Sequence, residues 1–219
     1  MVEHDTHTGE LASHGVGAVV LAAGLSTRMG QPKQLMMWGD QPMVRCVVDV
    51  LAASGVAASA IVVVVGHRRD EVTEAVSGSA AKTVFNSGYA DGSMLRSLQV
   101  GLTALLSPEY NGGALPEAAL AALGDQPQIK VEVVQAMIAA WRAGAGKVVA
   151  PSYGGRRGNP VLFARELWPE ILSAPPVGSP RDLLGKFVGR TALVEVDDDS
   201  VVRDIDTPEE YRQELARRV

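Results

Sequence analysis

The chain of 219 residues has only one cysteine, Cys46, so an internal disulfide is excluded and the sequence fits a reducing compartment. Cys46 lies in an apolar helical pattern, which predicts a buried and unreactive thiol rather than a nucleophile. No apolar run approaches the roughly 20 residues that cross a bilayer, and runs such as Ile61–Val65 have the length of a strand. We therefore expect a cytoplasmic protein that makes no use of a membrane.

An excess of basic residues is also missing. The chain has 20 Lys and Arg against 25 Asp and Glu, a formal charge of −5, which argues against a nucleic-acid partner. A nucleotide-sized anion remains possible in a local cationic pocket. With 47% hydrophobic residues the chain can bury a substantial core. We expect a disordered polar tail over residues 1–15, whose histidines fit no compact metal site, and one domain over residues 16–219.

Short β-rich runs alternate with longer helical stretches along the chain. Strands are expected at residues 16–21, 61–65, 82–85, 119–123, 147–150, 161–163, 191–196 and 201–205. Helices are expected at residues 43–53, 70–76, 93–106, 131–143, 166–172 and 182–188, and after Thr207, where a cap precedes a proline and two acids. Several strands are apolar on both faces. This alternation predicts an α/β fold with a mostly parallel sheet between two helical layers.

The first strand runs into a loop of small residues that carries Gly24, Arg28, Gly30 and Lys33. Glycine lets backbone N–H groups approach a polyanion closely, and the two cations match the charge of a triphosphate. This pattern favours a loop that holds a nucleotide by its phosphates. The alternative is an ordinary strand-to-helix loop with two solvated cations.

Two better-known phosphate loops are absent from this region. Five residues separate Gly24 from Gly30 and Gln31 follows, whereas the Walker loop requires four residues and then a lysine. The dinucleotide fingerprint requires a glycine where Ser26 stands. The loop therefore belongs to neither class.

Acidic residues follow two other expected strands. Asp125 precedes a proline turn, and Asp204 and Asp206 follow the expected strand at 201–205. Ligands of open parallel sheets bind beyond the carboxyl ends of the strands, and Mg²⁺ uses one or two carboxylates together with phosphates and waters. Asp125 with Asp204 or Asp206 is thus a candidate magnesium site. Alternatively, Asp125 begins a turn and Asp206 caps the last helix, and His67 is a loop residue rather than a base.

Several short motifs recur in one order along the chain: LAAG at 21–24, RMG at 28–30, PKQL at 32–35, Asn86, GSMLRSL at 92–98, LGDQP at 123–127, RGNPVLF at 157–163 and DIDTPE at 204–209. In this order they resemble the motifs of the molybdenum cofactor cytidylyltransferases and the wider MobA/MocA-like nucleotidyltransferases. The resemblance extends from about residue 16 to the C-terminus. It implies a Rossmann-like α/β/α fold of the nucleotidyltransferase (glycosyltransferase-A-like) type.

The resemblance also implies a reaction and a set of site residues. A Mg²⁺-dependent enzyme of this family joins a nucleoside triphosphate to a phosphorylated acceptor, here molybdopterin by default, and releases pyrophosphate. LAAG rather than LAGG favours CTP. The implied catalytic residues are Arg28, Lys33 and Asp125. Asp125 is the implied metal ligand, and Asp204 and Asp206 join it as candidate ligands from their place after an expected strand. The implied nucleotide-binding residues are Leu21, Ala22, Ala23, Gly24, Arg28, Gly30, Lys33, Asn86, Ser97 and Asp125. The implied acceptor-binding residues are Gln126, Arg157, Gly158, Asn159, Pro160 and Arg181.

One region departs from the family pattern. Relatives often carry a Gly-Asp-x-Gly loop near the acceptor, but residues 177–182 read VGSPRD, where proline stiffens the loop and Arg181 changes its charge. The sequence therefore does not determine the identity of the acceptor. Two other functions remain: an NAD(P)H-dependent oxidoreductase on the same fold, and a non-catalytic chaperone that hands the cofactor to a molybdoenzyme.

Overall fold

The computed structural model describes residues 15–26 and 29–218. Arg28, and all of the expected N-terminal tail except Gly15, lie outside the described residues. In the described part of the chain, no helix is long and apolar enough to cross a membrane.

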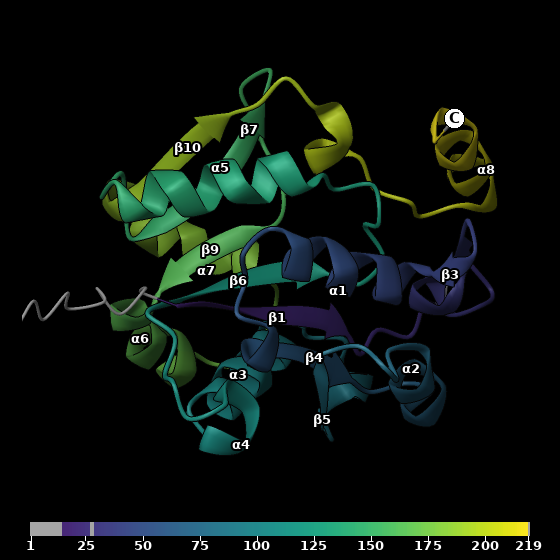
Figure 1. Ribbon diagram of the computed structural model, residues 1–219, viewed down its shortest axis with the longest axis horizontal. Helices are drawn as coiled ribbons and strands as arrows, with labels where there is room; N and C mark the ends of the chain where they lie inside the picture. The colour runs from purple at the N-terminus through teal and green to yellow at the C-terminus, as the bar shows by residue number, and fades with distance from the viewer. Residues whose placement is uncertain (1–14, 27–28, 219) are drawn as a thin grey trace, which may run out of the picture.

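The main sheet has β1 (Val16–Ala22) near its centre (Figure 1). Its neighbours β4 (Ile61–Val65) and β6 (Ala118–Leu123) run parallel to it, and β5 (Lys82–Phe85) extends the sheet beyond β4. Beyond β6 lie β9 (Val161–Ala164), β7 (Val148–Tyr153) and β10 (Thr191–Glu195), and β8 (Arg156–Arg157) pairs with the end of β7. Only β9 runs antiparallel to its neighbours on this path. The predicted mostly parallel sheet is confirmed.

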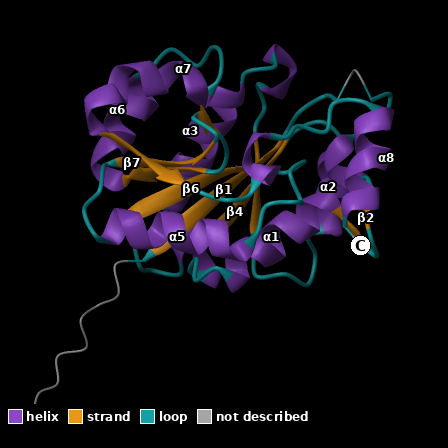
Figure 2. Cartoon of the chain, turned by 90° about the horizontal axis from the view of Figure 1, so that it is seen from above, coloured by secondary structure: helices purple, strands orange, loops and turns teal. Residues whose placement is uncertain are grey.

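Helices cover both faces of this sheet (Figure 2). One layer holds α1 (Met43–Ala53), α2 (Arg69–Ala75) and α5 (Val131–Arg142). The other holds α3 (Met94–Leu105), α4 (Pro108–Asn111), α6 (Trp168–Ser173) and α7 (Pro180–Leu184). At one end, α8 (Pro208–Arg217) lies beside the β2–β3 hairpin (Met37–Trp38, Gln41–Pro42). Short 3-10 turns complete the chain: η1 (Lys33–Leu35), η2 (Ala58–Ala60), η3 (Tyr89–Asp91), η4 (Arg165–Leu167), η5 (Gly185–Arg190) and η6 (Asp199–Val202).

The central strand explains why the fold needs two helical layers. Ala18 and Val20 are buried in the cluster formed with α1 and α5, whereas Val19 is buried in the opposite cluster formed with α3 and α6. A strand with apolar side chains on both faces is stable only where both faces are covered. The short apolar runs of the sequence therefore form the middle layer.

One expected strand is wrong. Residues 201–205 do not join the sheet: 199–202 form the 3-10 turn η6, and 203–206 are irregular. The Asp198 side chain accepts a hydrogen bond from the Ser200 N–H (3.0 Å), which favours the turn. Val201 is buried, and its carbonyl accepts a hydrogen bond from the Asn159 N–H. The apolar residues here serve burial rather than sheet pairing.

The register of the sheet decides where the loops emerge. Leu21 of β1 lies beside Leu123 of β6, so the loops that follow these two strands leave the same edge side by side. The chain continues from β1 to β4 on the other side, so the strand order reverses here, and ligands of such sheets bind at this point. The Gly24–Lys33 loop and Asp125 are thereby brought to one crevice.

Close packing between α3 and β1 gives a stability test. A Cβ on Gly101 would lie 2.2 Å from Cγ1 of Val19, so Gly101→Ala forces the helix away from the sheet. Overpacking costs about 1–3 kcal/mol, which outweighs the gain of about 1 kcal/mol in helix propensity. We expect a lower free energy of unfolding in urea. Gly189→Ala, which meets open space on an exposed turn, is the control and should be neutral. Wild-type stability of Gly101→Ala would contradict this packing.

Candidate active site

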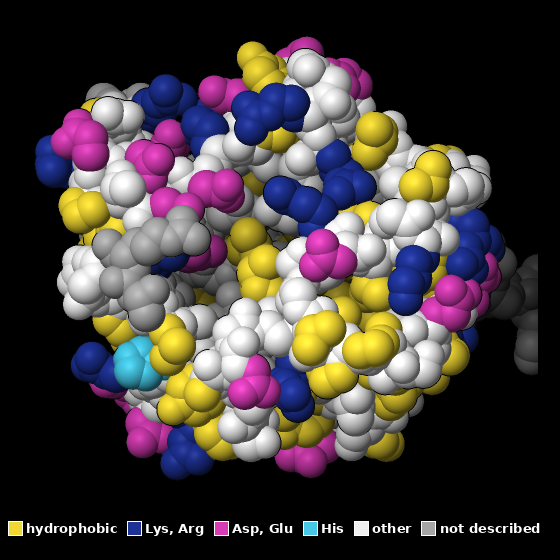
Figure 3. Space-filling model, turned by 180° about the vertical axis from the view of Figure 1, so that it is seen from behind, with side chains coloured by type: hydrophobic (Ala, Val, Ile, Leu, Met, Phe, Trp, Pro, Cys, Tyr) yellow, Lys and Arg dark blue, Asp and Glu magenta, His cyan; other side chains and the backbone are white. Residues whose placement is uncertain are grey.

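A cleft of about 590 Å³ opens at the carboxyl edge of the sheet. Its walls come from the loop after β1, the start of α3, the loop after β6, the segment from β8 to β9, the start of α7, and residues 204–206. Figure 3 shows a hollow in this face of the molecule, with basic side chains gathered on one rim and acidic side chains on another. The cleft thus combines both signs of charge.

The loop after β1 is held in shape by a buried glutamine. Gln34 is 4% exposed, and its Nε2 donates to the Ala22 carbonyl (3.2 Å). Ser26 Oγ donates to Gln34 Oε1 (3.2 Å) and accepts from the Lys33 N–H (3.1 Å), with Ser26 itself at φ +49°. These bonds tie Ser26, at the beginning of the loop, to Lys33 and Gln34 at its end. No sequence pattern predicts this role for Gln34 or Ser26, although Gln34 stands in the PKQL motif.

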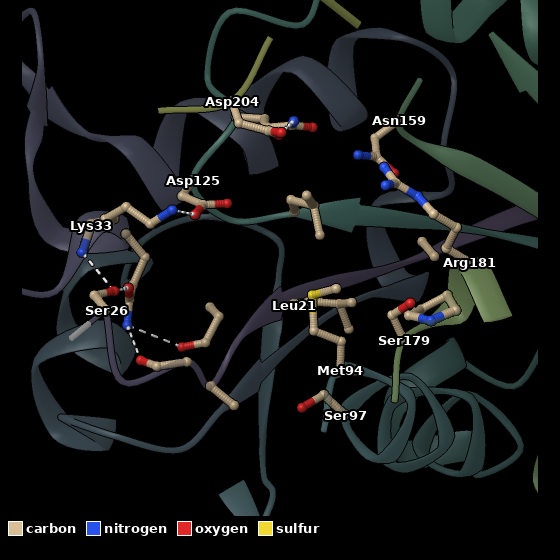
Figure 4. A pocket seen from close by; sticks show the side chains of 18 of the residues that line it. Leu21, Ser26, Lys33, Met94, Ser97, Asp125, Asn159, Ser179, Arg181 and Asp204 are labelled. Atoms are coloured by element: carbon tan, nitrogen blue, oxygen red, sulfur yellow. Dashed lines mark hydrogen bonds and ion pairs between the residues drawn. The ribbon is translucent and has the colours of Figure 1, made fainter. Parts of the chain in front are cut away.

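Three charged residues from distant parts of the chain meet in the cleft. Lys33 Nζ lies 2.6 Å from Asp125 Oδ2 and 2.9 Å from Asp206 Oδ1 (Figure 4 draws the Lys33–Asp125 side of this group). Burial by itself lowers the pKa of Lys33, but the carboxylates of Asp125 and Asp206 together outweigh it and raise this pKa above its ordinary value. Lys33 is therefore an ammonium ion throughout the neutral range.

Asp206 does not cap the last helix. Thr207 is the N-cap of α8: its Oγ1 accepts from the Glu210 N–H (3.2 Å), and Glu210 Oε2 accepts from the Thr207 N–H (2.8 Å). The capping interpretation of Asp206 was wrong, since Thr207 completes the capping box and the Asp206 carboxylate faces Lys33.

The three carboxylates expected to hold a metal have different hydrogen-bond and ion-pair partners. Asp125 and Asp206 share one ammonium group, whereas Asp204 Oδ1 accepts from Gln126 Nε2 (2.9 Å). In the part of the chain that the structure describes, no three His, Cys, Asp or Glu residues converge as a metal-binding group. The pair of Asp125 and Asp206 fits Mg²⁺, because it already shares one cation and this ion completes its shell with phosphates and waters.

The opposite wall is formed by the start of α3. Ser97 lines the cleft, but Asn86 is buried behind it and does not. Asn86 Nδ2 donates to Ser97 Oγ (3.0 Å), so Asn86 orients Ser97 instead of facing a ligand. Tyr89 and Met94 also line the cleft. Met94 stands in the GSMLRSL motif but is not among the implied site residues. Tyr89 carries no sequence signal, because an aromatic residue near a helix start is equally typical of a core.

The third wall carries the residues expected at the acceptor. Arg157, Asn159 and Arg181 line the cleft, as do Gly158 and Gln126, whereas Pro160 and Gly30 do not. A Cβ on Gly158 would lie 2.2 Å from the Val201 carbonyl oxygen, so the backbone requires glycine here. Burial lowers the pKa of Arg157, and the positive charge of Arg181 lowers it further.

A small apolar cluster fixes the loop after β1 relative to the segment at residues 204–206. Met29 from the loop and Ile205, between Asp204 and Asp206, are both buried in it with Met36, Trp38 and Met43. Tyr211 and Leu215 of α8 pack against the same cluster. The distance between the loop and the acids is therefore set by packing as well as by charge.

Two other candidates lie outside the cleft. His67 follows β4 and is not among the cleft residues, in agreement with its interpretation as a loop residue. Cys46 lies in α1, half-buried, and burial raises the pKa of its thiol. A raised pKa leaves little thiolate at neutral pH, in agreement with the prediction of an unreactive group.

Known proteins resemble this chain in sequence over nearly its whole length. A family model described as the MobA-like NTP transferase domain matches residues 18–192. A molybdenum cofactor cytidylyltransferase of Escherichia coli K12 is 25% identical over 198 residues, which are 90% of this chain and 93% of that protein.

Solved structures agree with the sequence matches. Rv0371c from Mycobacterium tuberculosis H37Rv has a TM-score of 0.75 at 25% identity, over 92% of this chain and 98% of that chain. The structure of Rv0371c in complex with manganese has a TM-score of 0.66 at 25% identity, over 92% of this chain and 98% of that chain. A nucleotidyl transferase from Methanothermobacter thermautotrophicus has a TM-score of 0.74 at 25% identity, over 94% of this chain and 99% of that chain. The family model spans most of the chain, and these matches share its α/β nucleotidyltransferase fold, so the chain belongs to the MobA-like NTP transferase domain family of nucleotidyltransferases.

Proposed function

We propose that this protein transfers CMP from CTP to the phosphate of molybdopterin or a related phosphorylated acceptor and releases pyrophosphate. The observation that carries this proposal is the meeting of Lys33, Asp125 and Asp206 in one cleft at the carboxyl edge of the sheet. A nucleotidyltransferase needs cations for a triphosphate and carboxylates for a divalent metal at one place. The domain responsible is residues 16–219.

The triphosphate is assigned to the loop after β1. Ser26 and Gln34 tie the described ends of this loop together, which supports a binding site at this place. Lys33, kept protonated by its raised pKa, neutralises phosphate charge, and Arg28 of the same loop adds a second cation in the family pattern. The base then extends toward Ala23 and Ser97, and Ala23 of the LAAG motif favours cytidine.

Mg²⁺ is assigned to Asp125 and Asp206. Asp204 accepts a hydrogen bond from Gln126 beside them. When bound, the ion neutralises the charge on the α-phosphate and on the leaving pyrophosphate. A relative of this chain forms a complex with manganese, which supports a divalent ion in the cleft. Lys33 and the two carboxylates orient the groups around the reacting phosphorus.

The acceptor is assigned to the wall that carries Arg157, Asn159 and Arg181. An oxygen of its phosphate attacks the α-phosphorus, a bond forms between them, and the bond from phosphorus to the bridging oxygen breaks as pyrophosphate leaves. A phosphate nucleophile is already anionic at pH 7, so the cleft needs no strong general base. The Escherichia coli relative is named a molybdenum cofactor cytidylyltransferase, which supports molybdopterin as the acceptor.

Asp125→Asn tests the metal assignment. Loss of the carboxylate charge should lower pyrophosphate release by about 100-fold or more, because the metal loses a charged ligand. The melting temperature should stay close to that of the wild type. Asp197→Asn, an exposed acid outside the cleft, is the matched control and should keep full activity. Undiminished turnover in Asp125→Asn would refute this assignment.

A panel of nucleotides tests the substrate. Thermal shift and pyrophosphate release are measured with CTP, GTP, ATP and UTP, each with Mg²⁺ or with EDTA, and with molybdopterin present or omitted. Thermal shift is also measured with NADPH. We expect CTP with Mg²⁺ to give the largest stabilisation, and pyrophosphate release to require both the metal and the acceptor. Stabilisation by NADPH alone would favour the oxidoreductase alternative. Binding of CTP with no pyrophosphate release under any condition would favour the chaperone alternative.

A further inference from the structure

The segment that joins α6 to α7, residues 174–179, is fixed to α3 at both ends, and we call it the strap. At its beginning, Gln99 Nε2 donates to the carbonyls of Ile171 and Ala174 (2.8 Å each). At its end, the Gly178 carbonyl accepts from Ser93 Oγ (3.2 Å) and from the Leu95 N–H (3.1 Å). The strap therefore follows the first turns of α3 and ends at the rim of the cleft.

The end of the strap sets the direction of α7. Gly178 has φ +80°, and a Cβ on it would lie 2.4 Å from Asp182 Oδ2. That oxygen accepts from the Ser179 N–H (2.7 Å) and Ser179 Oγ (3.1 Å), which starts the helix that carries Arg181. Any side chain at Gly178 would strain the backbone and press on the same carboxylate. The placement of Arg181 thus depends on Gly178.

Arg181 lies at the end of the cleft opposite Lys33. Figure 4 shows it beside Asn159, with Leu21 and Met94 between it and the Lys33–Asp125 pair. Arg157 lines the same wall, and its positive charge and that of Arg181 act on each other. Within residues 15–26 and 29–218, no carboxylate lies within ion-pair distance of either guanidinium. The nearest acid, Asp182, feels the charge of Arg181, but its carboxylate is hydrogen-bonded to Ser179 and makes no ion pair with the guanidinium. Two like charges close together are unfavourable, and an anion bound between them relieves this repulsion.

We propose that Ser93 and Gly178 are positioning residues, which hold the strap so that Arg181 and Arg157 together bind a phosphate monoester of the acceptor. This inference rests on the proposed function for the identity of the acceptor, but not for the anion site. Two guanidinium groups match a dianion in charge, and their forked donors match phosphate oxygens in geometry. A carboxylate brings one charge and fits the pair less well.

The anion site is tested with inorganic phosphate, titrated into the full chain and followed by calorimetry. Arg157→Gln and Arg181→Gln should each weaken binding by about tenfold or more, since a charged hydrogen bond is lost. Lys33→Met should keep this binding, which separates it from phosphate held by the loop after β1. Arg156→Gln, on the same strand as Arg157 but outside the cleft, is the matched control and should behave as the wild type.

The positioning role is tested by Gly178→Ala and Ser93→Gly. Ser93→Gly removes the hydroxyl that donates to Gly178 and accepts from the Arg96 N–H, and glycine is itself well tolerated at an N-cap. Both variants should weaken phosphate binding by about threefold to tenfold, and Ser93→Thr, which restores the hydroxyl, should rescue it. In turnover, the KM for the acceptor should rise while the KM for CTP stays constant. Melting temperatures confirm that each variant is folded.

Two results would overturn the inference. If Arg157→Gln and Arg181→Gln bind phosphate as tightly as the wild type, the proposed anion site is wrong. If those two variants lose phosphate binding while Gly178→Ala and Ser93→Gly keep it, the proposed positioning role of Gly178 and Ser93 is wrong. Arginine-dependent phosphate binding by a wild-type protein that binds no nucleoside triphosphate would support the anion site and contradict only the proposed function.

Discussion

The cleft depends on one ion group, in which the Lys33 ammonium lies between the carboxylates of Asp125 and Asp206. These residues come from the loop after β1, the loop after β6 and the segment before α8. Two carboxylates brought this close repel each other unless a cation lies between them, and burial strengthens the repulsion. The Lys33 ammonium therefore offsets the repulsion between the two carboxylates that the fold brings together here.

The sheet brings these segments together by its register. Leu21 and Leu123 are paired in neighbouring parallel strands, so the first two segments leave the sheet at adjacent points. Gly124, the next residue, packs closely against the end of β1. Its N–H donates to the Leu21 carbonyl (3.0 Å), and a Cβ on Gly124 would lie 3.1 Å from that oxygen. The third segment arrives from outside the sheet and is held by burial of Ile205. Regular pairing thus fixes two of the three charges, and packing fixes the third.

The layers of the fold could be predicted from the sequence because they depend on local patterns. The bounds of β4, β5 and α1 match the expected ranges, since each is an apolar run or amphipathic stretch between turn residues. Residues 201–205 show the limit: Val201 and Val202 look like a strand, but the side chain of Asp198 selects a turn. Likewise, Gln34, Ser93 and Gly178 are recognised only once the fold shows which backbone groups they meet. Their partners lie across the loop or up to 85 positions away.

The apolar cluster beneath α8 has a consequence for heat inactivation. Met29 of the loop after β1 and Ile205 of the segment before α8 are buried against Tyr211 and Leu215 of α8, away from the main core. A helix at the periphery, with few buried side chains of its own, opens at a lower free energy than the central strands. Opening of α8 would release the loop and the acids together while the sheet stays folded. Such a protein loses its cleft on warming before it loses its secondary structure, and a ligand that bridges the two segments protects it by delaying this first step.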